Sequence, residues 1–249
     1  YLDDTGAGLC ACDISTGKAQ ATVFTGPDRV RALLNEMGRF SPAEAVLNET
    51  AYFDEALHRT LTDRFGCHME KLPASRFSAE DAEKKVRAQF GSDALDRLPR
   101  DNLTPLLALG GLLGYLYETQ KTDLGHLDQL TWYRTGQYME LDLTARRNLE
   151  LTETLRGKEK RGSLLWVLDK TKTAMGARNL RAWLQQPLVD VAAIDRRLGA
   201  VAALAEHTVA REELTLALSG IADMERLIGR VVYGSAGGRD LVSLRSSME

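Results

Sequence analysis

Residues 8–25 of the chain are GLCACDISTGKAQATVFT. Apolar and polar residues alternate on both sides of Thr16-Gly17, a pair that is typical of a tight turn, so this stretch predicts a β-hairpin. Strand and helix patterns then alternate along the chain. They predict a helix that begins at Asp28 and includes Met37, helices over 52–65 and 79–90, and short strands over 44–48 and 69–72. This alternation predicts an α/β fold for the first part of the chain.

The pattern changes near residue 100. Leucines at helical spacing follow Thr104 and Pro105, which we expect at the helix start as N-cap and first helical residue. A brief strand is predicted within 131–141. From Thr144 onward the periodicity predicts helices over 144–155, 162–170, 174–185, 190–206, 209–218, 220–232 and 238–249. We therefore expect two domains, an α/β domain over 1–102 and an all-α domain over 103–249.

Composition excludes a wholly disordered chain and a membrane-spanning protein. Hydrophobic residues make up 44% and charged residues 27% of the 249 positions, which is typical of a folded globular chain. The longest apolar run, 106–116, is interrupted by glycines and is too short to cross a bilayer, so we expect no membrane association. The net charge is −3, but residues 146–181 hold ten basic and four acidic side chains. Such a stretch could follow phosphates or form a solvated helix face.

Three cysteines, Cys10, Cys12 and Cys67, are an odd number without zinc-motif spacing, so we expect buried thiols in a reducing, cytoplasmic compartment. The four histidines are scattered singly and predict no ligand set; they are His58, His68, His126 and His207. The chain begins at Tyr1 without a methionine and stops at Glu249 inside a predicted helix. We therefore expect a piece of a longer protein.

Few motifs carry chemistry. Gly17-Lys18 and Gly157-Lys158 both lack the earlier glycine of a phosphate-binding loop. Asp13 on the first strand, with Glu49 as partner, offers a ribonuclease H-like nuclease hypothesis, but two-metal chemistry needs further converging carboxylates. An Asp beside a tight turn usually binds the turn's backbone instead.

The helical part holds the most distinctive strings. They are MELDLTARRNLE at 139–150, GSLLWVLD at 162–169 and TAMGARNLRAWLQQPL at 173–188, followed by DMERL at 223–227 and RDL at 239–241. In this order they resemble the core domain of the MutS family of mismatch-recognition proteins. Residues 8–24 are similar to the start of the family's connector domain. The sequence departs mildly from the family at Ala174, where Pro is common, and at Asn179, where a second apolar residue is common.

The resemblance implies a ribonuclease H-like connector without nuclease activity over 1–102, then an all-α core over 103–249 that is cut at the start of the lever helices. It implies no enzyme activity, active site, bound cofactor or metal in this segment. The parent would be a DNA-dependent ATPase that uses ATP and Mg²⁺, binds mismatched double-stranded DNA, recruits MutL and forms a homodimer. The segment would link the mismatch-binding and ATPase domains. A ribonuclease H-like nuclease and a helical scaffold that binds partners through residues 146–181 are the alternatives.

The residues expected to transmit between domains are Arg146, Arg147, Asn148, Glu150 and Arg178. We expect Asp142 to cap the helix of the first four, where Arg146 or Arg147 can pair locally with Glu150. On the third string, Gly176 suggests close approach of another helix, and Trp183 is expected on a core face. Phe53 and Glu55 match the Phe-x-Glu that the family uses at a mismatched base. Because Phe53 belongs to a predicted buried stripe, we interpret the match as coincidence.

Overall fold

The predicted hairpin is formed by β1 (Ala7–Asp13) and β2 (Lys18–Phe24), which pair antiparallel with Asp13 opposite Lys18. In the computed structural model, which describes residues 1–120, 124–134, 136 and 138–249, a third strand joins this sheet. It is β5 (Gln129–Trp132), which pairs parallel with β2 and gives the order β1-β2-β5. It overlaps the strand predicted within 131–141, a range whose residues 135 and 137 lie outside the described part.

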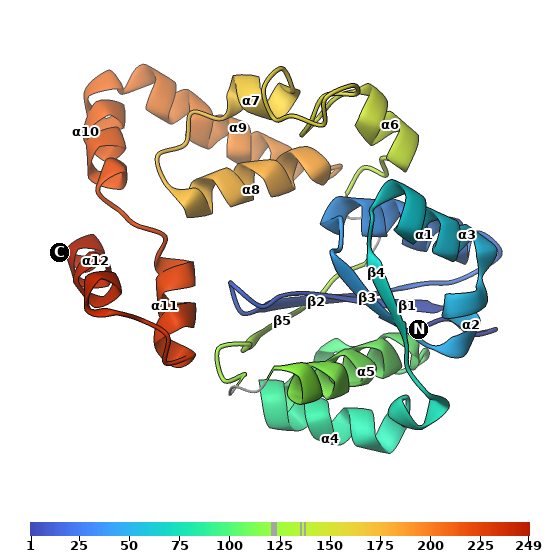
Figure 1. The fold of residues 1–249 in the computed structure, drawn as a ribbon. Helices are drawn as coiled ribbons and strands as arrows, with labels where there is room; N and C mark the ends of the chain where they lie inside the picture. Colours follow the sequence, from blue (N-terminus) through green and yellow to red (C-terminus); the bar gives the residue numbers. More distant parts are fainter. Residues whose placement is uncertain (121–123, 135, 137) are drawn as a thin grey trace. The chain divides into compact units, whose positions relative to one another are not determined.

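Two compact units divide the chain, Tyr1–Thr135 and Gly136–Glu249. In the first, helices cover both sides of the three-stranded sheet (Figure 1). α1 (Arg29–Phe40) and the short α2 (Glu49–Phe53) and α3 (Glu55–Arg59) lie on one side, and α4 (Ala79–Phe90) and α5 (Thr104–Thr119) lie on the other. A second, parallel sheet contains β3 (Glu44–Leu47) and β4 (His68–Lys71). The α/β prediction is therefore confirmed.

Each side of the sheet has its own apolar cluster, because successive residues of a strand face opposite ways. Ala7 and Leu9 face the cluster that contains Leu57 and Leu61. Cys10 and Cys12 pack against the other cluster, beneath α4 and α5. Burial raises the pKa of the Cys12 thiol to about 12 and raises that of Cys10 as well. All three cysteines are free, as expected of thiols that serve as small apolar groups.

The division between the units differs from the boundary expected at 102/103. α5 packs closely against α4 and β1, because glycines at both contacts leave room for the neighbouring element. A Cβ on Gly110 would lie 2.3 Å from the Cβ of Ala82 on α4, and a Cβ on Gly8 of β1 would lie 2.2 Å from the Thr104 carbonyl. α5 and β5 therefore belong with the α/β unit, and the described helices after Thr135 form the second unit.

The helix predicted over 52–65 is broken. α2 ends at Phe53, the Asp54 carboxylate caps α3, and a π-helical turn covers Thr60–Arg64. The predicted buried stripe is right for Leu57 and Leu61 and wrong for Phe53, which is 66% exposed. Asp54 explains the break, because its side chain starts a new helix inside the apolar pattern.

The second unit is helical, as predicted. α8 (Ala174–Gln185) has the predicted bounds, and four more helices agree within a few residues: α9 (Val191–Glu206), α10 (Thr208–Ser219), α11 (Met224–Val232) and α12 (Gly238–Met248). α6 (Leu143–Asn148) and α7 (Leu164–Leu168) are shorter than the helices predicted over 144–155 and 162–170. An isolated antiparallel bridge joins Tyr138 to Leu188.

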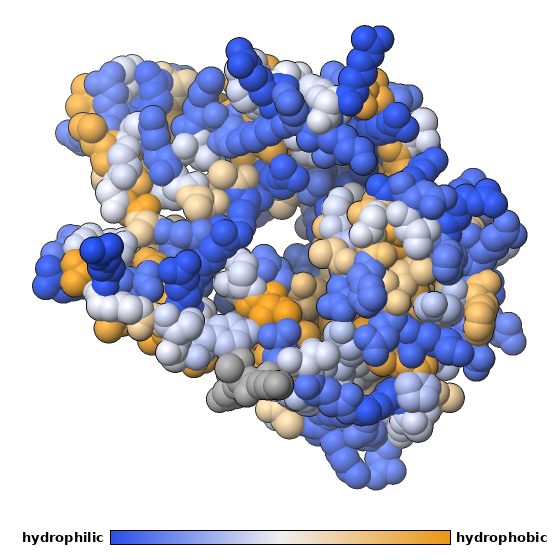
Figure 2. All heavy atoms as spheres, viewed as in Figure 1, coloured by the Kyte–Doolittle hydropathy of each residue, from blue (hydrophilic) through white to orange (hydrophobic). Residues whose placement is uncertain are grey.

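Apolar burial in the second unit is sparse. Of the large apolar side chains described there, Leu151 and Leu165 are buried, whereas Val201, Leu216 and Met248 are at least 63% exposed. Apolar surface is visible at α10 in Figure 2. No helix of the described residues is both long and apolar enough to span a bilayer.

Candidate functional site

The five residues expected to transmit between domains lie in the second unit, on two different segments. Arg146, Arg147 and Asn148 are on α6, Glu150 follows it, and Arg178 is in the first half of α8. The α6 segment begins as predicted, since the Asp142 carboxylate accepts a hydrogen bond from the Ala145 N–H at 2.6 Å. This bond satisfies one of the free N–H groups at the helix start.

Side chains on α6 differ in exposure. The Arg146 Nε donates to the Leu141 carbonyl at 2.9 Å, which fixes this partly buried arginine against the segment before the helix. Arg147 and Asn148 are exposed. Exposure leaves their side chains accessible to a partner, whereas Arg146 contributes to local structure.

Glu150 lies outside the helix, contrary to the prediction of a helix through residue 155. Its backbone has φ +46°, and its carboxylate accepts a hydrogen bond from the Leu155 N–H at 2.7 Å. The i,i+3 and i,i+4 spacing that suggested an ion pair with Arg147 or Arg146 requires a continuous helix. Because α6 ends at Asn148, that spacing no longer places the side chains on one helix face.

Arg178 has the most specific geometry of the five residues. Its Nη1 and Nη2 donate to the two carboxylate oxygens of Asp223, each at 2.7 Å, and Nη2 also donates to Glu225 at 2.7 Å. The three side chains are only 22–29% exposed. A bidentate arginine–carboxylate pair fixes direction as well as distance, so it joins α8 to the start of α11 in one orientation.

Arg178 and its two carboxylate partners stabilise one another's charged forms. Arg178 lowers the pKa of the Asp223 carboxyl, mainly through the hydrogen bonds, and the two carboxylates raise the pKa of the guanidinium. Asp223 is also the N-cap of α11, where its carboxylate accepts from the Arg226 N–H. A negative charge is favourable at that helix end.

Polar contacts also join α11 and the residues just before it to α12. The Arg230 guanidinium lies 3.0 Å from the Asp240 carboxylate, and the Ser247 hydroxyl accepts from the Ala222 N–H at 3.0 Å. The α11 segment is therefore held by polar contacts to both α8 and α12. Asp223 and Glu225 were not singled out from the sequence, although both lie in the string DMERL.

Two expectations for α8 are wrong. A Cβ on Gly176 would meet Thr173 and Thr171 at 3.0–3.4 Å, so the glycine makes room for the helix's own N-cap and not for another helix. Trp183 is 42% exposed, and the Arg197 guanidinium of α9 lies 3.8 Å from its ring centroid. A cation–π contact, rather than a buried core, therefore holds the indole.

Comparison with known proteins gives a match for both units. A family model described as MutS domain II matches residues 1–128, and one described as MutS domain III matches residues 144–249. The chain belongs to the MutS family. The two matches follow one another along the chain and correspond to the connector and the core that the sequence strings suggested.

Similar MutS proteins span the whole chain. The DNA mismatch repair protein MutS of Acetivibrio thermocellus is 40% identical over 248 residues, which is 100% of this chain and 28% of that protein. Those of Symbiobacterium thermophilum and Lachnoclostridium phytofermentans are 41% and 40% identical and cover 98% of this chain. The chain spans about a quarter of the length of these curated relatives.

The carboxylates of the nuclease hypothesis have structural partners. Asp13 accepts hydrogen bonds from the Ser15 N–H at 2.9 Å and from its hydroxyl at 2.7 Å, which is the turn geometry expected for an Asp at this place. Glu49 begins α2 and lies 3.6 Å from the Lys71 ammonium. Together with the MutS matches, these contacts favour a connector domain over a nuclease.

Phe53 and Glu55 are also placed by the structure. They lie on two different short helices, and the exposed Phe53 ring has the Lys71 ammonium 4.9 Å from its centroid. Phe53 lies within the MutS domain II match. Because Phe53 is exposed, the buried stripe no longer supports a coincidence, and that interpretation now depends on the position of the pair inside the domain II match.

The basic stretch 146–181 is partly neutralised. Besides Arg178, Lys160 pairs with Asp169 at 2.5 Å and lowers the pKa of that carboxyl to about 2. The other basic side chains after Arg146 are exposed, namely Arg147, Arg156, Lys158, Arg161, Lys170, Lys172 and Arg181. These side chains are solvated cations, as one of the two interpretations of this stretch expects.

Proposed function

We propose that this chain is the connector and core portion of a mismatch-recognition protein and that it links a mismatch-binding domain to an ATPase domain. The observation that carries the proposal is the order of the MutS domain II and domain III matches along one chain. Similarity over 98–100% of this chain to proteins named DNA mismatch repair protein MutS supports it. The segment itself would perform no reaction.

The finer features follow from the same resemblance. The α/β unit would have a ribonuclease H-like fold without nuclease activity. The parent would be a homodimeric, DNA-dependent ATPase that binds ATP with Mg²⁺, holds mismatched double-stranded DNA and recruits MutL. This segment would pass the ATP- and DNA-dependent state from one end of the parent to the other.

Transmission needs a stiff connection between elements, and the cluster of Arg178, Asp223 and Glu225 is suited to that role. A displacement of α8 would pull the N-terminal end of α11 through three charge-assisted hydrogen bonds. Arg147 and Asn148, which are exposed on α6, would contact another domain.

A chimera tests the proposal. The matching segment of Acetivibrio thermocellus MutS is replaced by this chain, and mutation frequency is measured in bacteria that lack their own MutS. We expect the chimera to lower the frequency relative to an empty vector, and we expect a chimera that carries Arg178→Ala to lower it less. A chimera that is expressed, soluble and without effect on the mutation frequency would contradict the proposal.

A further inference from the structure

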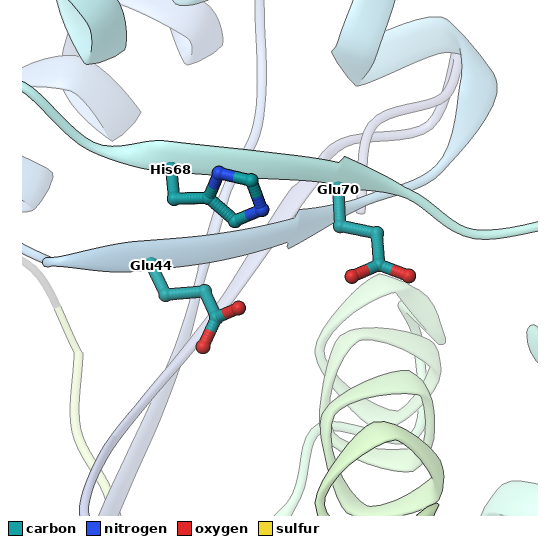
Figure 3. Close-up of side chains that lie close together, drawn as sticks. All are labelled: Glu44, His68 and Glu70. Carbon is teal, nitrogen blue, oxygen red and sulfur yellow. The ribbon is translucent and has the colours of Figure 1, made fainter. Parts of the chain in front are cut away.

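Three side chains with metal-binding atoms meet on the small parallel sheet of the first unit. Ligand atoms of Glu44, His68 and Glu70 all lie within 4.8 Å of one another. Figure 3 shows them side by side on the adjacent strands β3 and β4. Glu44 is more than twenty residues from His68 in the chain, so no spacing motif could indicate this cluster.

Backbone pairing fixes the arrangement. Glu44 is the register partner of His68, and Glu70 is two residues further along β4, so all three belong to one face of the sheet. The alternate residues Leu47 and Met69 face the apolar cluster on the other side. The three side chains are exposed, which gives an ion direct access.

Electrostatics favour a cation here. Two carboxylates stand close together, and neither forms an ion pair with a basic side chain in the part of the chain that the structure describes. The Tyr115 hydroxyl of α5 donates to Glu44 at 2.5 Å and orients that carboxylate. A bound dication would relieve the repulsion between the carboxylates and leave this hydrogen bond in place.

We propose that Glu44, His68 and Glu70 form a binding site for a Zn²⁺-type transition-metal ion. One imidazole nitrogen and two carboxylate oxygens are donors that zinc accepts, whereas Ca²⁺ and Mg²⁺ prefer oxygen alone. At metal–ligand distances of about 2.0–2.1 Å, tetrahedral ligand atoms lie about 3.4 Å apart. Exposed side chains can close from 4.8 Å to that separation by rotation. The fourth position would be taken by water.

The neighbouring thiol does not belong to the ligand set. Cys67 is buried, and its Sγ donates to the His68 carbonyl at 3.5 Å. It belongs to the apolar cluster that Leu47 and Met69 face, away from the three proposed ligands. The site is independent of the proposed role in mismatch repair, because it shares no residue with the cluster of Arg178, Asp223 and Glu225.

Calorimetric titration of the 249-residue chain with ZnCl₂ tests the proposal. We expect one ion per chain, and we expect His68→Ala and Glu70→Gln each to weaken binding roughly tenfold or more. The matched control is His58→Ala, which removes another exposed histidine of the same unit and should leave the affinity unchanged. All three positions are exposed, so circular dichroism should give unchanged thermal unfolding without metal.

A large excess of Ca²⁺ should not displace the zinc. The proposal fails if the wild-type chain shows no saturable Zn²⁺ binding. It also fails if His68→Ala binds as tightly as the wild type, if His58→Ala weakens binding as much as His68→Ala does, or if Ca²⁺ competes effectively.

Discussion

Replacing Arg178 by alanine removes the group that joins α8 to α11. Its three bonds to Asp223 and Glu225 are charge-assisted, and a hydrogen bond to a charged group contributes about 1.5–3 kcal/mol. The side chains are 22–29% exposed, so solvent screening reduces the effect, and bonds that share one guanidinium do not add. We expect the free energy of unfolding of the second unit to fall by about 2 kcal/mol.

Urea unfolding measures this loss. Trp132 on β5 reports on the first unit, so it is replaced by Phe in all variants, which leaves Trp166 and Trp183 as probes of the second unit. A loss of about 2 kcal/mol moves the urea midpoint down by about 1 M. The matched control is Arg226→Ala. Arg226 lies 3.7 Å from the Asp223 carboxylate and is 58% exposed, so its removal should cost less than about 0.5 kcal/mol.

The stability difference between wild type and Arg178→Ala should also depend on pH. Arg178 lowers the pKa of Asp223 in the folded chain, so the stability that this pair contributes is fully present above the unfolded pKa of about 3.9. It is lost as the pH falls through the lower, folded pKa. The stability difference between wild type and Arg178→Ala should therefore be constant near neutral pH and shrink below about pH 4. An unchanged midpoint, or a loss equal to that of Arg226→Ala, would refute the reasoning.

Three further predictions concern packing and DNA. Gly110→Ala should destabilise the first unit by about 3 kcal/mol, because its Cβ would lie 2.3 Å from a side chain of α4. Gly199→Ala, with open space around it, should instead stabilise α9 by about 0.5–1 kcal/mol, and thermal unfolding checks both variants. Trp183→Ala should cost only about 1–2 kcal/mol in urea unfolding, since the ring is 42% exposed and has a cation–π contact with Arg197. A loss above about 3 kcal/mol would mean that the ring is buried. The chain should bind a duplex with and without a G·T mismatch equally through the exposed cations of 146–181. The dissociation constants should be about 10⁻⁴–10⁻⁶ M, and binding should weaken steeply as the salt concentration rises. A preference for the mismatch above roughly tenfold in a fluorescence titration would contradict this prediction.

Local chemistry explains which elements could be predicted from the sequence. The β1–β2 hairpin depends on alternation and a turn, and the start of α6 depends on Asp142, all within a few residues. The same holds for α8, since the helical periodicity predicted its bounds of 174 and 185. Such elements form from neighbours in the chain, so a single sequence is sufficient.

Elements that depend on distant partners could not be predicted. α5 has the periodicity of any apolar helix, and its close contacts with α4 and β1, such as the approach of Ala82 to Gly110, show that it belongs to the first unit. Helical spacing placed Trp183 on an apolar face, but it cannot tell whether another element covers that face.

The candidate site shows the same limit. Arg178 was chosen through a family resemblance, while its partners Asp223 and Glu225, more than forty residues away, had no local signal. Within the cluster on β3 and β4, the sequence around His68 predicts no metal-ligand set, whereas strand pairing places Glu44 beside it.

The central claim is that this segment couples the two ends of a mismatch-recognition protein. Its most direct test is the lifetime of the complex between the purified Acetivibrio thermocellus chimera and G·T-mismatched DNA, measured with and without ATP and Mg²⁺. We expect ATP to change the lifetime in the chimera, and we expect Arg178→Ala to keep the mismatch preference while reducing the ATP effect. A chimera that prefers the mismatch and responds to ATP equally with and without Arg178 would contradict transmission through this cluster. One that folds but shows neither property would contradict the claim as a whole.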